Sequence, residues 1–335
     1  MLPLEHSKLL INSIVPKFSY NIGDDVTTFQ KNGCEMLTKL LGINKIQASE
    51  RKNYVRIEYD KQCADLNCRE IRFFAESENN VFVPCHLFIP NHLNYNALII
   101  SLHGHSTGMH VLAGREKYKI DKVTISDQEC DFAKQAILLG FPTLTIEQRG
   151  FGERGGNENG SLCSELSFRS IMMGRTLVGE RVFDTMHALN ALLYNSIGDI
   201  RFDKIICIGY SGGGTVATYL SALDNRINHA ILVSAISTFR DSICAMPHCA
   251  CNYIPNILEN FDMGNICQLI APRELTIVSG INDNLFPVLG AKESFNQALK
   301  VYKAYNSESK ITHIVTNGGH RFYPREVWSH LTSKK

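Results

Sequence analysis

Net charge of either sign and long apolar runs are both nearly missing from this sequence. Its 34 Lys and Arg residues balance 33 Asp and Glu residues, which leaves a formal net charge of +1. The chain therefore lacks the excess of positive charge that attracts nucleic acid or an anionic membrane surface, and we expect neither as a partner. No stretch approaches the run of about 20 apolar residues that a transmembrane helix needs.

The first residues also lack the basic stretch and apolar core of a secretion signal, and we therefore expect a cytoplasmic protein. The chain has eleven cysteines. In a reducing compartment these are expected to be free thiols rather than a disulfide framework.

Internal repeats, low-complexity tracts and proline-rich linkers are missing as well, which favours one main domain. A chain of 335 residues, 44% of them hydrophobic, is long enough for a large core with an appendage. We divide it into a helical N-terminal extension, 1–50, with helices near 11–18 and 25–41, and a main domain, 51–335. The extension is expected to form a lid, a pocket wall or the contact of a homodimer.

Short apolar segments alternate with helical patterns through the main domain. Alternating segments at 54–59, 70–75 and 81–89 predict an antiparallel entry to a sheet. Buried parallel strands are predicted at 97–102, 142–146, 205–208, 230–234, 275–278 and 311–315. Helices are predicted at 127–139, 178–194, 214–223 and 291–302. This order predicts a doubly wound, mostly parallel α/β sheet, with its site beyond the carboxyl ends of the strands.

One of these strand ends carries a Gly-x-Ser-x-Gly motif, Gly209-Tyr210-Ser211-Gly212-Gly213. In a nucleophile elbow the serine takes a strained backbone conformation that pushes its Oγ out of a strand-to-helix turn. The residues two before and two after it then approach too closely to carry side chains. The strand before the motif and the helical pattern after it provide the required context. The alternative is a glycine-rich turn in which Ser211 caps a helix.

The last two predicted strands are each followed by a residue that would complete a triad with Ser211. Asp283 lies in the turn after 275–278, and His320 lies in the loop after 311–315. The chain order Ser211, Asp283, His320 is the nucleophile, acid, base order of the elbow fold. His320 would take the proton of Ser211, and Asp283 would orient His320.

Other residues compete for the acid and base roles. Asp241 and Asp262 lie between two predicted strands, His313 falls inside a strand pattern, and His330 lies in the terminal helix. Because none of them follows a strand end in the required order, Asp283 and His320 are favoured.

The strand 97–102 is followed by His103-Gly104-His105. A His-Gly pair at this position commonly opens the oxyanion-hole loop. The backbone amides of His105 and Gly212 are the expected donors to an anionic tetrahedral intermediate. Metal ligation by His103 and His105 is disfavoured, because no carboxylate or second histidine pair has matching spacing.

Arg149, in the loop after 142–146, is expected to hold the oxyanion loop through a salt bridge or to touch an anionic substrate group, with the structural role favoured. The Gly-x-Gly at 150–152 is a weak nucleotide signal, since it opens no clear helix. His103 and Tyr210 are likewise candidates to support loops or contact substrate.

His248-Cys249-Ala250-Cys251 lies in a predicted cap-like insertion, about 237–265. One Cys-x-Cys cluster is a poor tetrahedral set by itself, so a packed segment that shapes the substrate pocket is favoured over a metal site.

Together these motifs resemble the α/β-hydrolase superfamily, in particular its dienelactone-hydrolase and acetyl-xylan-esterase-like branch. The resemblance covers about 53–330. Its matching pieces are His103-Gly104-His105, Gln148-Arg149-Gly150-Phe151-Gly152, Gly209-Tyr210-Ser211-Gly212-Gly213, Ile270-Ala271-Pro272-Arg273, Ser279-Gly280 before Asp283, and Gly318-Gly319-His320.

The resemblance implies a serine hydrolase of carboxylic esters with a small acyl group, which works through an acyl-enzyme and needs no metal or other cofactor. It places the catalytic roles on Ser211, Asp283 and His320 and the oxyanion role on His105 and Gly212. Two alternatives stay open: cleavage of a thioester or of a carbon–carbon bond in a β-diketone or polyketide-like substrate, and a non-catalytic protein on the same fold.

Overall fold

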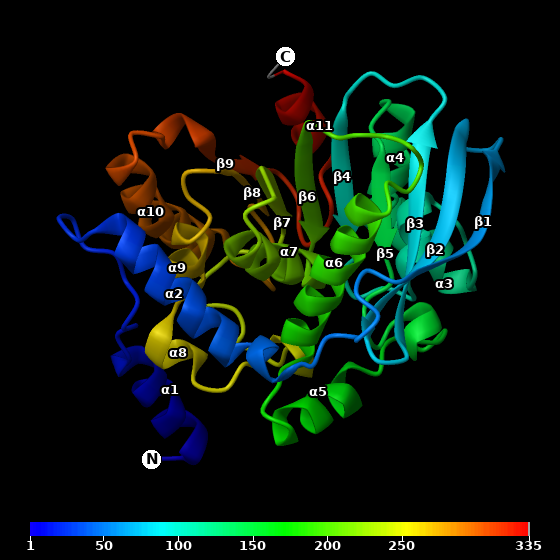
Figure 1. Cartoon of the computed structure of the whole chain (residues 1–335). Coiled ribbons are helices and arrows are strands. Elements are labelled where there is room, and N and C mark those ends of the chain that lie inside the picture. Colours follow the sequence, from blue (N-terminus) through cyan, green and yellow to red (C-terminus); the bar gives the residue numbers. More distant parts are fainter. Residues whose placement is uncertain (334–335) are drawn as a thin grey trace.

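A nine-stranded mixed sheet forms the centre of the computed structural model, which describes residues 1–333 (Figure 1). The strand order is β1-β2-β3-β5-β4-β6-β7-β8-β9. The strands are β1 (Val55–Cys63), β2 (Cys68–Glu78), β3 (Val81–Pro90), β4 (Ala97–Leu102), β5 (Thr143–Ile146), β6 (Lys204–Tyr210), β7 (His229–Val233), β8 (Glu274–Gly280) and β9 (Ile311–Thr316). β1, β2, β3 and β5 pair antiparallel, and all pairs from β5 through β4 to β9 are parallel. The predicted sheet, with its antiparallel entry, is confirmed.

Eleven α-helices surround this sheet in the described chain. They are α1 (Pro3–Ser13), α2 (Val26–Leu40), α3 (Lys119–Gln128), α4 (Phe132–Leu138), α5 (Cys163–Met172), α6 (Leu177–Tyr194), α7 (Gly212–Leu223), α8 (Ile257–Asn260), α9 (Met263–Gln268), α10 (Val288–Ala304) and α11 (Pro324–Thr332). The short 3₁₀ helices used below are η2 (Met109–Ala113) and η4 (Ala250–Asn252).

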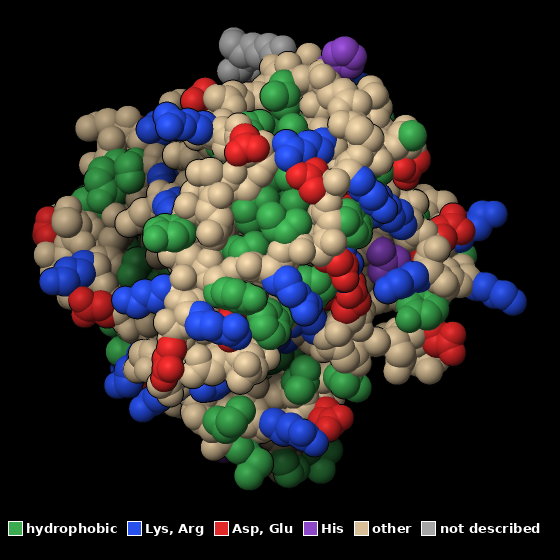
Figure 2. Space-filling model, turned by 45° about the vertical axis from the view of Figure 1, so that its right-hand side comes forward, with side chains coloured by type: hydrophobic (Ala, Val, Ile, Leu, Met, Phe, Trp, Pro, Cys, Tyr) green, Lys and Arg blue, Asp and Glu red, His purple; other side chains and the backbone are tan. Residues whose placement is uncertain are grey.

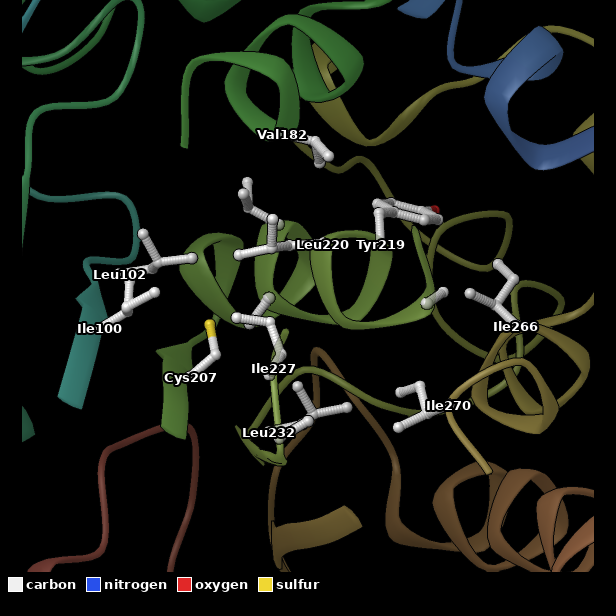
Figure 3. Close-up of a cluster of buried hydrophobic side chains, with 14 of the residues drawn as sticks. Ile100, Leu102, Val182, Cys207, Tyr219, Leu220, Ile227, Leu232, Ile266 and Ile270 are labelled. Carbon is white, nitrogen blue, oxygen red and sulfur yellow. The ribbon is translucent and has the colours of Figure 1, made fainter. Parts of the chain in front are cut away.

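The two faces of the sheet bury alternate residues of each strand. In β6, Cys207 faces the larger core with α6, α7, α9 and α10, whereas Ile206 and Ile208 face a second core with α4 and α11. Figure 3 shows α7 in the larger core, with Leu220 and Tyr219 among side chains from several strands and helices. Burial on both faces explains why the parallel strands are continuous apolar runs in the sequence.

The N-terminal extension differs in part from its prediction. The expected helix at 11–18 is wrong: α1 ends at Ser13, because the residue before Pro16 is disfavoured in a helix. Residues 14–20 then have no regular secondary structure, and the amides of Lys17 and Phe18 donate to the carbonyls of Glu259 and Asn260. α1 buries none of its residues, whereas α2 packs into the larger core (Figure 1).

The helix predicted at 127–139 is also wrong, because the structure has two helices there. α3 ends at Gln128, and Glu129 takes a left-handed backbone conformation with φ +52°. A non-glycine residue in that region stops a helix, so α4 begins anew at Phe132.

Acidic and basic side chains are interspersed on the face drawn in Figure 2, without a patch of one sign. Among residues 1–333, no helix combines the length and apolar character that crossing a bilayer requires. All eleven cysteines lie in this range, and all are thiols.

Candidate active site

Ser211 sits in a strained turn between β6 and α7. Its backbone has φ +52° and ψ −123°, a conformation that L-residues rarely adopt. A Cβ on Gly209 would lie 2.3 Å from the carbonyl oxygen of Gly213, and a Cβ on Gly213 would lie 2.0 Å from that of Leu102. Both glycines are therefore required by the close approach of the backbone. The geometry is that of a nucleophile elbow.

The structure brings Ser211, His320 and Asp283 into one hydrogen-bonded chain. Nε2 of His320 lies 2.8 Å from Oγ of Ser211, and Nδ1 lies 2.9 Å from Oδ2 of Asp283. These distances fit a tautomer in which Nδ1 donates to the carboxylate and Nε2 accepts from the hydroxyl.

Asp283 is fully buried, and the backbone holds its carboxylate in place. Its Oδ1 accepts from the amides of Leu285 and Phe286 at 2.9 and 3.0 Å. The Phe286 ring stacks on the His320 ring, with 5.8 Å between centroids. The carboxylate and this ring together restrict the orientation of the imidazole.

The competing acids and bases lie elsewhere. Asp241 accepts from the Thr238 hydroxyl, and Asp262 caps α9. His313 contacts Ser279, and His330 contacts Thr276. None of these four groups contacts Ser211 or His320 in the described chain.

Among residues 1–333, no acceptor is found for two backbone amides beside Ser211. Gly212 is the first residue of α7, and first-turn amides lack an intrahelical partner. The His105 amide, in the loop after β4, donates to no acceptor within residues 1–333. The His105 ring lies against Gly212, where an added Cβ would come within 2.7 Å of Nδ1 and Cε1.

A cavity of about 300 Å³ lies above Ser211. Its lining residues are His105, Gln128, Tyr210, Ser211, Gly212, Pro247, His248, Cys249, Asn252, Leu285, Phe286 and His320. The insertion at 237–265 thus contributes part of the wall. No described residue of 1–50 lines this cavity, and neither does any Asp, Glu, Lys or Arg.

Tyr210 packs beneath the triad rather than standing free in the cavity. Its hydroxyl lies 3.2 Å from the carbonyl oxygen of His320 and 3.3 Å from Oε1 of Gln128, so its one hydrogen can be donated to either acceptor. Burial raises the pKa of its phenol far above the ordinary value, so it stays protonated. Tyr210 therefore fastens the His320 loop, and Gln128, which sequence reasoning missed, helps to hold it.

His103 and Arg149 do not line the cavity, and both support loops. Nε2 of the buried His103 ring lies 3.2 Å from Oε1 of Glu147. Arg149 pairs with Glu78 at 2.7 Å, Glu180 at 3.2 Å and Asp184 at 2.6 Å. The geometry favours the structural role for Arg149.

His105 meets three cysteines on the side of its ring away from Gly212. Its Nε2 lies 3.3 Å from the sulfur of Cys251, which lies 3.3 Å from the sulfur of Cys249. Cys163, the first residue of α5, completes a group whose ligand atoms all lie within 4.8 Å of one another. Sequence reasoning considered Cys249 and Cys251 but missed Cys163, because the partners come from three distant segments. His248, the neighbour in the sequence motif, is outside the group and contacts Ser242 instead.

Comparison with known proteins identifies the fold. No family model matches the chain. A candidate hydrolase of Bacillus subtilis (strain 168), YtaP, is 27% identical to this chain over 199 residues. The matched region covers 56% of this chain and 62% of YtaP, so the chain spans less than two thirds of the length of YtaP. A candidate acetyl xylan esterase from Bacteroides fragilis NCTC 9343 has a TM-score of 0.80 at 14% identity, covering 100% of this chain and 95% of the other. A glucuronoyl esterase from Solibacter usitatus has a TM-score of 0.65 at 14% identity, with 96% of each chain covered. The fold is that of the α/β hydrolases.

Proposed function

We propose that this α/β-hydrolase chain is a serine hydrolase of carboxylic esters with a small acyl group. The observation that carries the proposal is the unbroken chain from Ser211 through His320 to the buried Asp283, at the floor of a cavity. A hydroxyl hydrogen-bonded to an oriented imidazole is the activated nucleophile of acyl transfer.

In the first half-reaction, Oγ of Ser211 attacks the ester carbonyl while Nε2 of His320 accepts the hydroxyl proton. The amides of His105 and Gly212 stabilise the anionic oxygen of the tetrahedral intermediate, and losing one such donor costs about 3 kcal/mol in the transition state. His320 then returns the proton to the departing alcohol, which leaves an acyl-enzyme on Ser211.

In the second half-reaction, His320 takes a proton from water, which attacks the acyl-enzyme. Collapse of the second intermediate releases the acid and returns the proton to Ser211. Asp283 stabilises the imidazolium in both halves without accepting a proton itself.

The cavity favours an uncharged group at the reacting carbonyl. Its wall contains no Asp, Glu, Lys or Arg and therefore offers no ion-pair partner to a charged acyl group. Its volume of about 300 Å³ limits the size of the group that fits. His248, Asn252 and Gln128 offer hydrogen bonds for polar substituents of the alcohol. Two structural neighbours are named for esterase activity, which supports ester cleavage over carbon–carbon bond cleavage. Eleven thiols without a disulfide support a cytoplasmic location.

A series of chromogenic esters of increasing acyl length tests this function, with Ser211→Ala as the blank. We expect kcat/KM to be highest for acetyl and to fall as the acyl chain outgrows the cavity. Turnover of a bulky aromatic β-diketone with no turnover of acetyl esters would contradict the proposal.

A further inference from the structure

We propose that His105, Cys163, Cys249 and Cys251 bind a zinc ion that holds the oxyanion loop against the insertion at 237–265. This group, the Cys₃His cluster, belongs to three segments that the fold brings together: the loop after β4, the start of α5, and η4 with the residue before it. The binding part of this inference is independent of catalysis. The part concerning the oxyanion loop rests on the proposed function.

The geometry of the cluster matches a small tetrahedral site. Zinc–sulfur bonds of about 2.3 Å place neighbouring ligand atoms of a tetrahedron about 3.8 Å apart. The cluster has contacts of 3.3 Å from Cys251 to His105 and to Cys249, and no ligand atom is more than 4.8 Å from another. Cys₃His is an established donor set for closed, structural zinc sites.

A buried positive charge beside the cluster also favours an anion there. Arg181 is 2% exposed, and its Nε and Nη2 donate to the neutral carbonyl of Arg149 at 3.0 and 2.7 Å, but it forms no ion pair with a carboxylate of residues 1–333. Its Nη2 donates to the sulfur of Cys163 at 3.0 Å, and its guanidinium lies over the Phe151 ring at 4.7 Å. A buried guanidinium without a counter-charge is strongly unfavourable. Zinc with three thiolates and a neutral imidazole carries one net negative charge, which Arg181 would neutralise.

The position of Cys163 also favours its thiolate form. Cys163 begins a helix of ten residues, where the helix dipole stabilises an anion. Thiolates are the form of cysteine that binds metal.

Zinc at this place would position a catalytic group without touching the substrate. Coordination through Nε2 of His105 leaves the ring proton on Nδ1, on the edge that lies against Gly212. The ring would then be held between the metal and the elbow, and the His105 amide would stay aimed at the oxyanion. Cys249 lines the cavity as well, so the same ion would fix part of the substrate wall.

Metal analysis of the untagged full-length chain tests the binding. Protein purified with a non-chelating reductant and then dialysed is expected to hold about one zinc per chain. Cobalt(II) in place of zinc is expected to give the intense visible absorption of a tetrahedral thiolate site. Zinc content is expected to fall at least tenfold in Cys251→Ser and in Cys163→Ser.

Two further variants address the risk that loss of a buried cysteine unfolds the chain. His105→Ala removes an exposed side chain and Cys249→Ser a half-exposed one, and both are expected to fold and to bind zinc at least tenfold more weakly. The matched control is Cys244→Ser, a cysteine of the same insertion outside the cluster, which is expected to keep full zinc content. The proposal is overturned if the wild-type protein holds no zinc after incubation with excess zinc, if all variants bind it equally, or if Cys249 and Cys251 form a disulfide under reducing conditions.

Kinetics separate the positioning role from the proposed function. Removing zinc with a chelator is expected to lower kcat on an acetyl ester at least tenfold with little change in KM, and added zinc is expected to restore it. Unchanged kcat after complete removal overturns the positioning role. Zinc bound by a wild-type protein that hydrolyses no ester would instead contradict the proposed function and leave the metal site standing.

Discussion

Nε2 of His320 lies 2.8 Å from Oγ of Ser211, although 109 positions separate the two residues in the chain. Ser211 follows β6 and His320 follows β9, and both strands run parallel in the same sheet. Parallel strands present their carboxyl ends at one edge, so two loops that are distant in sequence converge there. Asp283, after β8, joins them at the same edge.

Replacing Asp283 with Asn tests the role of the carboxylate. The amide oxygen can still accept from Leu285 and Phe286, but its NH₂ group would face Nδ1 of His320 and force the ring proton to Nε2. We expect kcat on an acetyl ester to fall by about 10⁴, with a melting temperature close to that of the wild type. Asp241→Asn, an aspartate between β7 and β8 that contacts Thr238, is the matched control and is expected to keep full activity. Equal activity of the two variants would remove Asp283 from the mechanism.

The hydrogen-bonded arrangement of Ser211, His320 and Asp283 could be predicted from the sequence, because each residue follows a buried strand whose apolar run is easy to recognise. The elbow adds a local signature, since Gly209 and Gly213 are required by contacts within a few residues or with the adjacent strand. Loop position and chain order then selected Asp283 and His320 from several acids and histidines.

The Cys₃His cluster could not be predicted in the same way. Cys163 lies 86 positions before Cys249, on a helix that reaches η4 only through tertiary packing, and His105 comes from a third segment. His248 is next to Cys249 in the sequence, but it contacts Ser242, and the histidine of the cluster is His105. The break between α3 and α4 was missed too, because the left-handed conformation of Glu129 has no glycine to signal it.

Gly213→Ala tests whether close backbone contacts require glycine at position 213 of the elbow. The new Cβ would lie 2.0 Å from the carbonyl oxygen of Leu102 and 2.5 Å from that of His103, both of them backbone atoms that cannot easily move. We expect the free energy of unfolding to fall by about 3 kcal/mol in chemical denaturation. Gly319→Ala is the control, because its Cβ would meet nothing nearer than 3.7 Å, and it is expected to cost less than about 1 kcal/mol. A Gly213→Ala protein as stable as wild type would show that the turn is not constrained as described.

Asp184 is expected to make stability depend on pH in acid. Burial alone would raise the pKa of this carboxyl, but the charges of Arg154 and Arg149 outweigh burial and lower the pKa below its ordinary value. The pKa of Asp184 is therefore lower in the folded state than in the unfolded state, where it is about 3.9. The stabilisation is fully present above the unfolded-state pKa and is lost as the pH falls from there through the folded-state pKa. The wild type is therefore expected to lose stability below about pH 4.

The variant Asp184→Asn measures this contribution. It leaves two partly buried guanidinium groups, those of Arg149 and Arg154, without their shared partner, so we expect a loss of about 3 kcal/mol at pH 7 and a flatter stability profile below about pH 4. Asp60→Asn is the control: Asp60 pairs with Arg69 at the surface, and its loss is expected to cost less than about 1 kcal/mol. An unchanged acid profile in Asp184→Asn would contradict the assignment.

Shortening the N-terminus tests what the extension does. Deletion of 1–13 removes α1, which buries no residue, and is expected to change the free energy of unfolding by less than about 1 kcal/mol. Deletion of 1–20 also removes Phe18, which stacks on Phe261 at 5.0 Å, and the buried Tyr20, and is expected to cost about 3 kcal/mol or more. Chemical denaturation of both proteins gives the comparison. Equal stability of the two deletions would show that 14–20 does not anchor the extension.

The central claim is that Ser211 is a nucleophile activated by His320. Labelling with a fluorophosphonate, followed by intact-protein and peptide mass spectrometry, tests it most directly. The account predicts one adduct, on Ser211, and no adduct in Ser211→Ala, whose kcat is expected to fall by about 10⁶. Ser221→Ala, at the far end of the same helix α7 and buried without a hydrogen-bond partner among the described residues, is expected to label and turn over as the wild type does. An adduct on another residue, or none on the folded wild-type chain, would contradict the account.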